Sequence, residues 1–359
     1  KANGTTLGAD NGMGVAMAMA LAEDKTIEHG PQTLLFTVRE EIGLKGAEEI
    51  DPNILVHENK RDKPVIVVNC DSEFGADLLC VGCAGAQDVS ARFELADARE
   101  DMPEGYIGVR VDLTGLPGGH SGIEIHEGRG NAIQLLNALL TETKLMFSGI
   151  KLININSSPD AKRNVIPSSV SFEIAVPIEN LEIIKATMKG FLDALKAMPS
   201  HVNDKLCIYE NMVTSPEFLK DIALHTTSMP VDKPRVVNDR TRDCIMAAIG
   251  NICNLSTEAQ GGFMGGVITS SNLGIARHLR DTDTLELGVL ARSAKNDELK
   301  RRTKAIAQIF HDNGAQTEIS AGYEGWLEPE DSAATKLATE AVRSATGKEA
   351  QTFPVHAGL

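Results

Sequence analysis

Cysteine is scarce in this chain, with six among 359 residues. So few cysteines do not form the disulfide scaffold of a secreted domain, and they favour free thiols in a reducing cytoplasm. Cys80 and Cys83 have the CxxC spacing, but neither a second such pair nor a nearby pair of histidines accompanies them. We therefore expect buried thiols here rather than a structural zinc ion, and a cytoplasmic protein.

Long apolar runs and an excess of positive charge are also missing. No stretch approaches the ~20 apolar residues of a transmembrane helix, which predicts a soluble protein with no membrane partner. The formal net charge is −15 and the pI is near 5.1. Binding to nucleic acid or to a membrane surface needs basic patches, so this charge argues against both. The remaining composition, 42% hydrophobic over 359 residues, predicts two domains with substantial cores.

The first 88 residues alternate helix and strand signals. Residues 14–23 and 43–50 favour helices, because they are rich in good helix formers. The apolar residues 33–38 and 65–70 are bounded by breakers, as are short strands of a parallel sheet that is covered on both faces. This alternation is typical of a βαβ arrangement.

From about residue 88 the expected strands become more polar and alternate in hydrophobicity. Asn164 and Asn272 each precede a strand that is followed by a helix, and this weak internal echo suggests a duplicated α+β region. The expected strands cover 89–95, 108–113, 151–156, 170–176 and 284–292, and the expected helices cover 131–142, 180–196 and 296–311.

The last part of the chain resembles the first region again. After a segment marked by Gly, Trp and Pro, we expect a helix over 331–346 and a strand over 352–355. The predicted fold class is α/β, with a mixed sheet flanked by helices in one domain and an α+β domain inserted into it. The predicted boundaries are 1–88 with 327–359 for the interrupted domain, and 89–326 for the insertion.

Four carboxylates near the start of the chain suit metal chemistry. Asp10 lies in a glycine-rich turn, Glu40 and Glu41 follow one predicted strand, and Asp71 follows the other. Acidic groups outside the carboxyl ends of parallel strands are where α/β enzymes build sites. Two adjacent carboxylates repel each other, which destabilises the charged forms unless a cation neutralises them. Taken singly, each could be a cap or lie in a solvated loop, but together they predict a hydrolase with oxygen-rich metal ligation.

Three polar residues of the middle region are candidates for substrate binding. His120 is flanked by glycines, which let the backbone approach another group closely, although it could also be a polar turn histidine. Asn164 could donate its amide to a polarised carbonyl or fix a turn. Arg292 ends an apolar strand, where its guanidinium could hold a carboxylate bidentately or form a surface salt bridge.

These motifs, taken together, resemble the carnosinase-like zinc dipeptidase family, and in particular its branch that cleaves Xaa-His dipeptides. The similarity runs along essentially the whole chain, and the matching stretches occur in family order. They are GTTLGADNGMG, TVREEIGLKGA, NCDSE, VGCAGAQD, GLPGGHSGIEIHEGRGNA, RNVIP and HAGL.

The resemblance implies a zinc-peptidase catalytic domain that is interrupted by a lid domain, which often supports a homodimer. It implies two zinc ions per subunit, with cobalt or manganese as alternatives. Asp10 would bridge the two ions, Glu41 would bind one of them and Asp71 the other. Glu40 would act as general base toward the zinc-activated water that hydrolyses a dipeptide.

The resemblance also places three residues on the lid. His120 and Asn164 would stabilise the tetrahedral intermediate, and Arg292 would hold the C-terminal carboxylate of the substrate. In some family dimers the histidine is contributed across the interface.

Two departures from the family pattern concern the ends of the chain. The family has one histidine ligand before the Asp10 segment and another after the HAGL stretch, and neither is present. The chain also starts at Lys1 with no methionine or signal peptide, so we expect an internal fragment that binds zinc poorly and is inactive. Two alternatives remain open: a zinc-dependent deacylase of N-acyl amino acids, and a degenerate dimeric homologue that binds without catalysis.

Overall fold

The computed structural model describes most of the chain, as two compact units. Unit 1 consists of Lys1–Leu79, Asp331–Gln351 and Leu359, and unit 2 consists of Cys80–Glu330 and Thr352–Gly358. The described residues are 11–40, 44–55, 65–71, 75–197, 206–209, 212–214, 216–229, 234–252, 255–257, 266–329 and 331–358.

Unit 1 contains three α-helices, α1 (Gly12–Glu23), α2 (Lys45–Glu48) and α7 (Ala333–Thr346), among its described residues. The side chain of Asn11 caps α1 by accepting a hydrogen bond from the Gly14 amide. The side chain of Ser332 caps α7 in the same way, and Gly347 ends that helix in the left-handed conformation. All three helices were predicted from the sequence.

The two parallel strands predicted in this unit are wrong. Residues 33–38 and 65–70 form no strand, and their side chains are exposed. β-branched composition favours an extended backbone, but a parallel strand also needs hydrogen-bonded neighbours and cover on both faces. No strand pairs with either segment within the described part of the chain.

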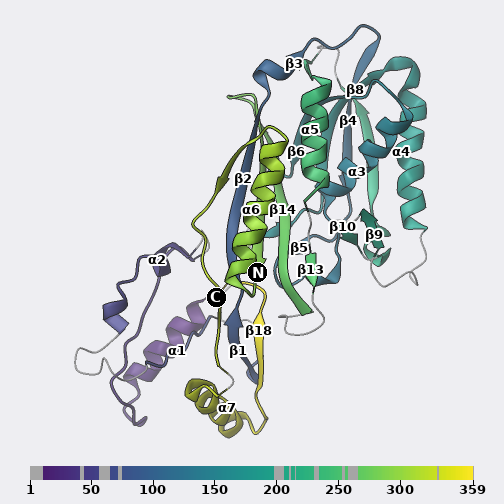
Figure 1. Cartoon of the computed structure of the whole chain (residues 1–359). Coiled ribbons are helices and arrows are strands. Elements are labelled where there is room, and N and C mark those ends of the chain that lie inside the picture. The colour runs from purple at the N-terminus through teal and green to yellow at the C-terminus, as the bar shows by residue number, and fades with distance from the viewer. Residues whose placement is uncertain are drawn as a thin grey trace. The chain divides into compact units, whose positions relative to one another are not determined.

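Unit 2 is built on a large antiparallel sheet (Figure 1). Its main path runs β11-β4-β8-β6-β14-β15-β2-β16. The strands of this path are β2 (Gly85–Glu94), β4 (Tyr106–Thr114), β6 (Lys151–Ser157), β8 (Val170–Pro177), β11 (Ala223–Ser228), β14 (Val267–Leu279), β15 (Thr284–Ser293) and β16 (Gln316–Ile319). The strands predicted over 89–95, 108–113, 151–156, 170–176 and 284–292 are confirmed.

Shorter strands complete the two units. The strands β1 (Leu78–Cys83), β17 (Trp326–Leu327) and β18 (Gln351–Val355) form a three-stranded sheet, and the predicted strand over 352–355 is confirmed as β18. A two-stranded pair joins β5 (Gly119–His120) to β7 (Val165–Ile166). The others are β3 (Arg99–Glu100), β9 (Leu206–Tyr209), β10 (Met212–Thr214), β12 (Val236–Val237) and β13 (Leu255–Thr257).

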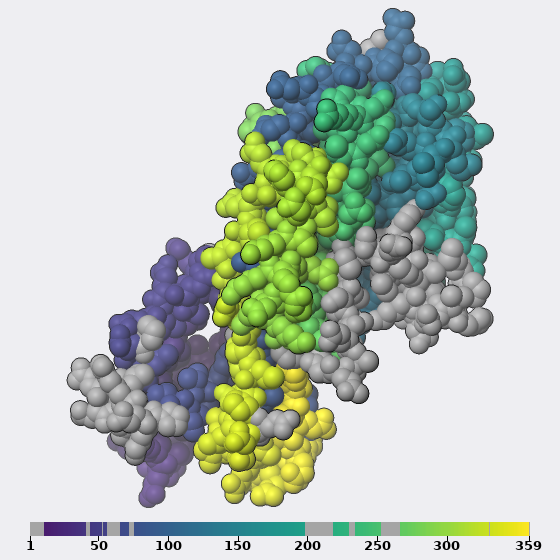
Figure 2. All heavy atoms as spheres, viewed as in Figure 1, coloured from purple at the N-terminus to yellow at the C-terminus, as the bar shows by residue number. Residues whose placement is uncertain are grey.

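Four helices pack against the large sheet, and the hydrophobic core is formed by side chains of these helices and of the sheet. They are α3 (Ala132–Met146), α4 (Leu181–Lys196), α5 (Asp239–Gly250) and α6 (Asn296–Asp312). Helix α6 lies along β2, whereas α3 contacts both α4 and α5 (Figure 1). Figure 2 shows that α6 (yellow-green) and α5 (green) both reach the surface on the face seen there. Their inward side chains are buried. Phe310 of α6 is fully enclosed, and its burial stabilises the folded protein by about 1.5–3 kcal/mol relative to an exposed side chain.

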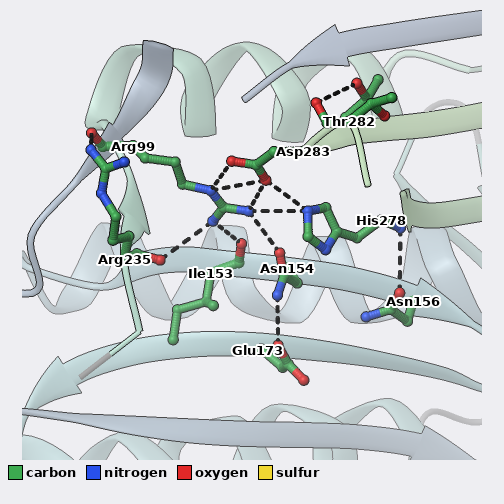
Figure 3. Close-up of polar contacts among 10 residues, drawn as sticks. Arg99, Ile153, Asn154, Asn156, Glu173, Arg235, His278, Thr282 and Asp283 are labelled. Carbon is green, nitrogen blue, oxygen red and sulfur yellow. Dashed lines mark hydrogen bonds and ion pairs between the residues drawn. The ribbon is translucent and has the colours of Figure 1, made fainter. Parts of the chain in front are cut away.

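A polar network joins the turn between β14 and β15 to the neighbouring strands (Figure 3). The guanidinium of Arg99 donates to the carboxylate of Asp283, with the Nη2–Oδ1 distance at 2.8 Å, and to the Ile153 carbonyl. Arg99 Nη2 also reaches the side-chain oxygen of Asn154, and Asp283 Oδ1 is 2.7 Å from His278 Nε2. Since the Arg99 side chain is only 6% exposed, these partners compensate a charge that is held away from water.

Within the described residues, no helix has the length and hydrophobicity needed to cross a membrane.

Candidate functional site

The carboxylates predicted to bind metal are only partly described. Asp10 and Glu41 lie outside the described residues. Glu40 is exposed and Asp71 is half-buried, and both belong to unit 1. Over the described ranges, no three His, Cys, Asp or Glu side chains form a group that could hold a metal ion. The metal-ligand and general-base roles of these residues stay predictions.

The two cysteines of the CxxC pair are both described, and they are not joined by a disulfide. Cys83 is buried and Cys80 is half-buried. The expected burial is therefore confirmed for Cys83, whereas Cys80 is only partly covered.

The three predicted substrate-binding residues all belong to unit 2, and two of them lie at the two-stranded pair of β5 and β7: His120 within β5 and Asn164 directly before β7. In the pairing of β5 with β7, His120 is opposite Val165, the residue that follows Asn164. The amide of Ser121 donates to the carbonyl oxygen of Asn164 at 2.8 Å. Backbone hydrogen bonds therefore hold His120 close to Asn164, although the two residues are 44 positions apart in the sequence. Asn164 remains exposed.

The surroundings of His120 determine which ring nitrogen carries the proton. Its Nδ1 lies 3.2 Å from the amide nitrogen of Gly122 and 3.0 Å from that of Ile123, and it accepts from both. Burial lowers the pKa of His120 to about 4, and the positive charge of Arg292 adds to this effect. The ring is therefore neutral near pH 7. Because Nδ1 is an acceptor, the proton lies on Nε2, which is a donor.

Arg292 is a buried cation on β15. Arg292 is only 5% exposed, and its Nη1 donates a hydrogen bond to the hydroxyl of Tyr323 at 3.1 Å. Its Nε is buried and has no hydrogen-bond partner, and no carboxylate forms an ion pair with it among the described side chains. The positive charge of Arg292 acts on the carboxylate of Asp88, but the two groups form no close ion pair. A buried cation that lacks a close counter-charge is destabilising, so this position suits an anionic ligand.

A second buried histidine, His356, lies in the same cluster. It follows β18, is fully buried, and its Nε2 is 2.8 Å from the hydroxyl of Ser270. Ser270 is directly opposite Arg292 in the β14–β15 pairing, so the two side chains share a face of the sheet. Burial lowers the pKa of His356 to about 3, and the nearby charge of Arg292 acts in the same direction. His356 is therefore neutral near pH 7.

Gly122 marks the point where these groups converge. A Cβ at Gly122 would contact the backbone carbonyl of His356, and would lie 3.0 Å from the His120 ring and 3.2 Å from Arg292 Nε. Three segments that are distant in the sequence therefore meet around one glycine. The result is a positive charge flanked by two neutral imidazoles, an arrangement that can bind an anion and donate hydrogen bonds to an adjacent oxygen.

Sequence reasoning did not single out His356 or Tyr323 as functional residues. His356 was noticed only as part of the HAGL stretch, and its small neighbours Ala357 and Gly358 were the available signal. Tyr323 accepts from Arg292, and burial raises the pKa of its phenol, which therefore stays protonated. Both residues come from the end of unit 2 that follows β16, and only the tertiary structure brings them to Arg292.

Comparison with known proteins identifies relatives of the whole chain. The M20 model described as a peptidase dimerisation domain matches residues 111–202. The chain is 31% identical to the cytosol non-specific dipeptidase of Escherichia coli K12, over all of its own length and 67% of the relative. The crystal structure of an aminoacylhistidine dipeptidase from Vibrio alginolyticus matches with a TM-score of 0.75 at 27% identity, over 100% of this chain and 67% of that one. These matches confirm the predicted α/β fold class and the presence of a lid-type dimerisation domain.

Proposed function

This chain belongs to the M20 family of peptidases, which are peptide-bond hydrolases, and we propose that it acts as a metal-dependent dipeptidase on substrates that include Xaa-His dipeptides. The names of the relatives from E. coli and V. alginolyticus support this substrate class. The observation that carries the proposal is the buried guanidinium of Arg292, which forms no ion pair with a carboxylate among the described side chains and whose Nε has no hydrogen-bond partner there.

A dipeptide supplies the missing partner. Its C-terminal carboxylate binds Arg292, which supplies N–H donors in a planar fork. Since only one residue separates this carboxylate from the scissile bond, binding at Arg292 also fixes the position of the carbonyl to be attacked. Restriction to short substrates follows, because a longer chain would place a neutral peptide group, and not a carboxylate, against the buried cation.

The neighbouring donors act on the scissile carbonyl. The Nε2–H of His120 and the exposed side-chain amide of Asn164 meet its oxygen as negative charge develops there. Preorganised donors of this kind contribute about 3–4 kcal/mol each to transition-state stabilisation. His120 suits this role because it stays neutral near pH 7 and does not rely on protonation to donate.

The acid–base chemistry is assigned to unit 1. Glu40 takes the proton of the attacking water and delivers it to the leaving amine. Asp10, Glu41 and Asp71 are the proposed ligands of two divalent ions, zinc in the first place, with cobalt or manganese as alternatives. When bound, these ions would polarise the scissile carbonyl and lower the pKa of the attacking water.

The lid and the oligomer are part of the same proposal. Residues 89–326 form the lid and dimerisation domain, inserted into a catalytic domain of 1–88 and 327–359. The match of the dimerisation model to residues 111–202 supports a homodimer. A cytoplasmic location is supported by the name of the E. coli relative.

Substitution of Arg292 tests the proposal in the full-length protein. We expect Arg292→Lys to lose about 2–3 kcal/mol of binding to the carboxylate, which raises KM for Ala-His about 30- to 150-fold. The C-terminal amide of Ala-His lacks the carboxylate, so its already poor hydrolysis should change little. Arg277→Lys is the matched control, because Arg277 lies on the same hairpin and pairs with Glu286 at the surface.

Two results would contradict the proposal. One is an equal loss of Arg292→Lys on the free acid and on the amide. The other is hydrolysis of an N-acetyl amino acid with no hydrolysis of any dipeptide, which would move the assignment to a deacylase.

A further inference from the structure

We propose that Asn272, a buried residue of β14, is a positioning residue that holds the turn bearing Asn164, and with it His120, in the orientation needed for the reaction. The proposal rests on the substrate-binding roles given to Asn164 and His120 above. The sequence did not indicate this role. Asn272 was expected to precede a strand, whereas the residue lies within β14.

The side chain of Asn272 clamps the backbone on both sides of Asn164. Its Nδ2 donates to the carbonyl oxygen of Arg163 at 2.9 Å and to that of Val165 at 2.8 Å. The carbonyl between them, that of Asn164, accepts from the Ser121 amide. Three successive carbonyls are therefore bound, and the peptide planes before and after Asn164 are both fixed.

The amide group of Asn272 is itself held in one orientation. Its Oδ1 faces the Nδ2 of Asn131 at 3.3 Å, and this Nδ2 also donates to the Leu273 carbonyl at 2.9 Å. The Oδ1 of Asn131 in turn caps α3 by accepting from the amides of Ile133 and Gln134. If the Asn272 amide were flipped, its oxygen would face two carbonyl oxygens, so this chain of hydrogen bonds allows only one arrangement.

The shape of β14 brings the turn within reach of Asn272. The pairing with β15 shifts register between Leu273 and Ile275, which makes Gly274 the extra residue of a β-bulge. A Cβ at Gly274 would lie 2.5 Å from the Lys162 carbonyl oxygen and 2.8 Å from Arg163 Cα. The backbone of the turn therefore rests directly on the strand at a position where only glycine leaves room.

The expected effect is on the transition state more than on substrate binding. Asn164 and His120 meet charge that develops during the reaction, and misplacement of such groups by about 1 Å costs up to about 100-fold in rate. Asn272→Asp places a carboxylate against two carbonyl oxygens while leaving the volume unchanged. We expect it to lower kcat about 10- to 100-fold, with a much smaller change in KM.

The experiment uses the full-length, metal-loaded protein with Ala-His as substrate. It measures kcat and KM for Asn272→Asp, for the milder Asn272→Ser, for Asn164→Ala and for the double variant Asn164→Ala/Asn272→Ser. The matched control is Asn137→Asp, because Asn137 is also buried and donates to a backbone carbonyl, that of Met246, on the neighbouring helix α5. The control should lower the melting temperature but leave kcat unchanged.

Each outcome decides between the proposals. Loss of kcat in the Asn272 variants, with no further loss when Asn272→Ser is added to Asn164→Ala, supports the clamp. If Asn164→Ala lowers kcat and a folded Asn272→Ser does not, the clamp is refuted and the role of Asn164 stands. An equal fall of kcat in Asn137→Asp also refutes it, because the effect is then one of general stability. If Asn164→Ala leaves kcat unchanged, the proposed role of Asn164 itself fails.

Discussion

Replacing Asp283 by Asn isolates the contribution of one half-buried ion pair to the stability of unit 2. Asp283 has a φ of 47°, in the left-handed region, and Asn tolerates this conformation better than other residues with side chains. The turn between β14 and β15 is therefore kept. What is lost is the negative charge that pairs with Arg99 at 2.8 Å and with His278 at 2.7 Å (Figure 3).

The size of the loss follows from the pKa of Asp283. Hydrogen bonding from Arg99 is the largest cause that lowers this pKa from 3.8 to about 2. A difference of about 1.8 pH units corresponds to about 2.5 kcal/mol at 1.36 kcal/mol per unit. The carboxylate side chain is 31% exposed, and screening by solvent reduces the expected contribution to about 1–2 kcal/mol at neutral pH.

The sign of the pH dependence is fixed by the lowered pKa. A carboxyl group whose pKa is lower in the folded state stabilises it above the unfolded pKa of 3.8, and this contribution is lost as the pH falls toward 2. Asn does not titrate. We therefore expect Asp283→Asn to reduce the free energy of unfolding by about 1–2 kcal/mol at pH 7, and the difference from the original protein to shrink below pH 4.

Urea unfolding followed by circular dichroism, at pH 7 and pH 3, measures this difference. Asp281→Asn is the control, because Asp281 lies in the same turn but is exposed. The kinetic constants at pH 7 should not change, since Asp283 lies at the opposite end of the hairpin from the Ser270–Arg292 pair. A difference that is the same at both pH values, or an equal loss in the control, would refute the reasoning.

Further predictions concern the site itself. Gly122→Ala should lower kcat/KM at least tenfold, because the added Cβ contacts the His356 carbonyl and crowds His120 and Arg292. Gly190→Ala, on the exposed face of α4 with open space around it, should instead leave activity unchanged and raise the free energy of unfolding by about 0.5–1 kcal/mol. Glu40→Gln should lower kcat about 100-fold or more without a comparable change in KM. Removal of divalent metal by a chelator should abolish hydrolysis by the full-length protein, and added Zn²⁺ should restore it; activity that survives chelation would contradict the metal dependence.

The elements that sequence reasoning found are those whose periodicity is strong. The helix expected over 131–142 is α3, which is longer by four residues at its C-terminal end, and the strand expected over 284–292 is β15. Helix α5 was missed although its capping signal is present, because Asn238 accepts from the Thr241 amide as an N-cap residue does. Local patterns of this kind are readable without tertiary information.

The errors occur where an element depends on a partner. The strands expected over 33–38 and 65–70 have suitable composition, but nothing in a single segment indicates which strand will pair with it. The long strand β14 was missed for the opposite reason. The residues at its centre are polar, Ser270 and Asn272 included. They are nevertheless buried, because these two side chains bond to distant segments.

The candidate site divides in the same way. His120, Asn164 and Arg292 were found because their motifs are unusual in local sequence and resemble a family, and unit 2 brings them together. His356, Tyr323 and Asn272 were not found, since each acts through a residue that is between 31 and 109 positions away in the chain. Motifs report the groups that face a ligand more readily than the groups that hold them.

The register of one hairpin links these supporting residues to those they support. Ser270 and Asn272 lie on the same side of β14, because side chains alternate along a strand, and Ser270 faces Arg292 across the pair. A slip of one residue would move both to the opposite face and separate the Asn164 turn and His356 from the guanidinium. The bulge at Gly274 stands directly after this segment and absorbs the extra residue, so the pairing toward the Asp283 turn continues without imposing a slip on the site. Lengthening or shortening β14 between Ser270 and Gly274 should therefore be far more damaging to activity than the same change near the turn.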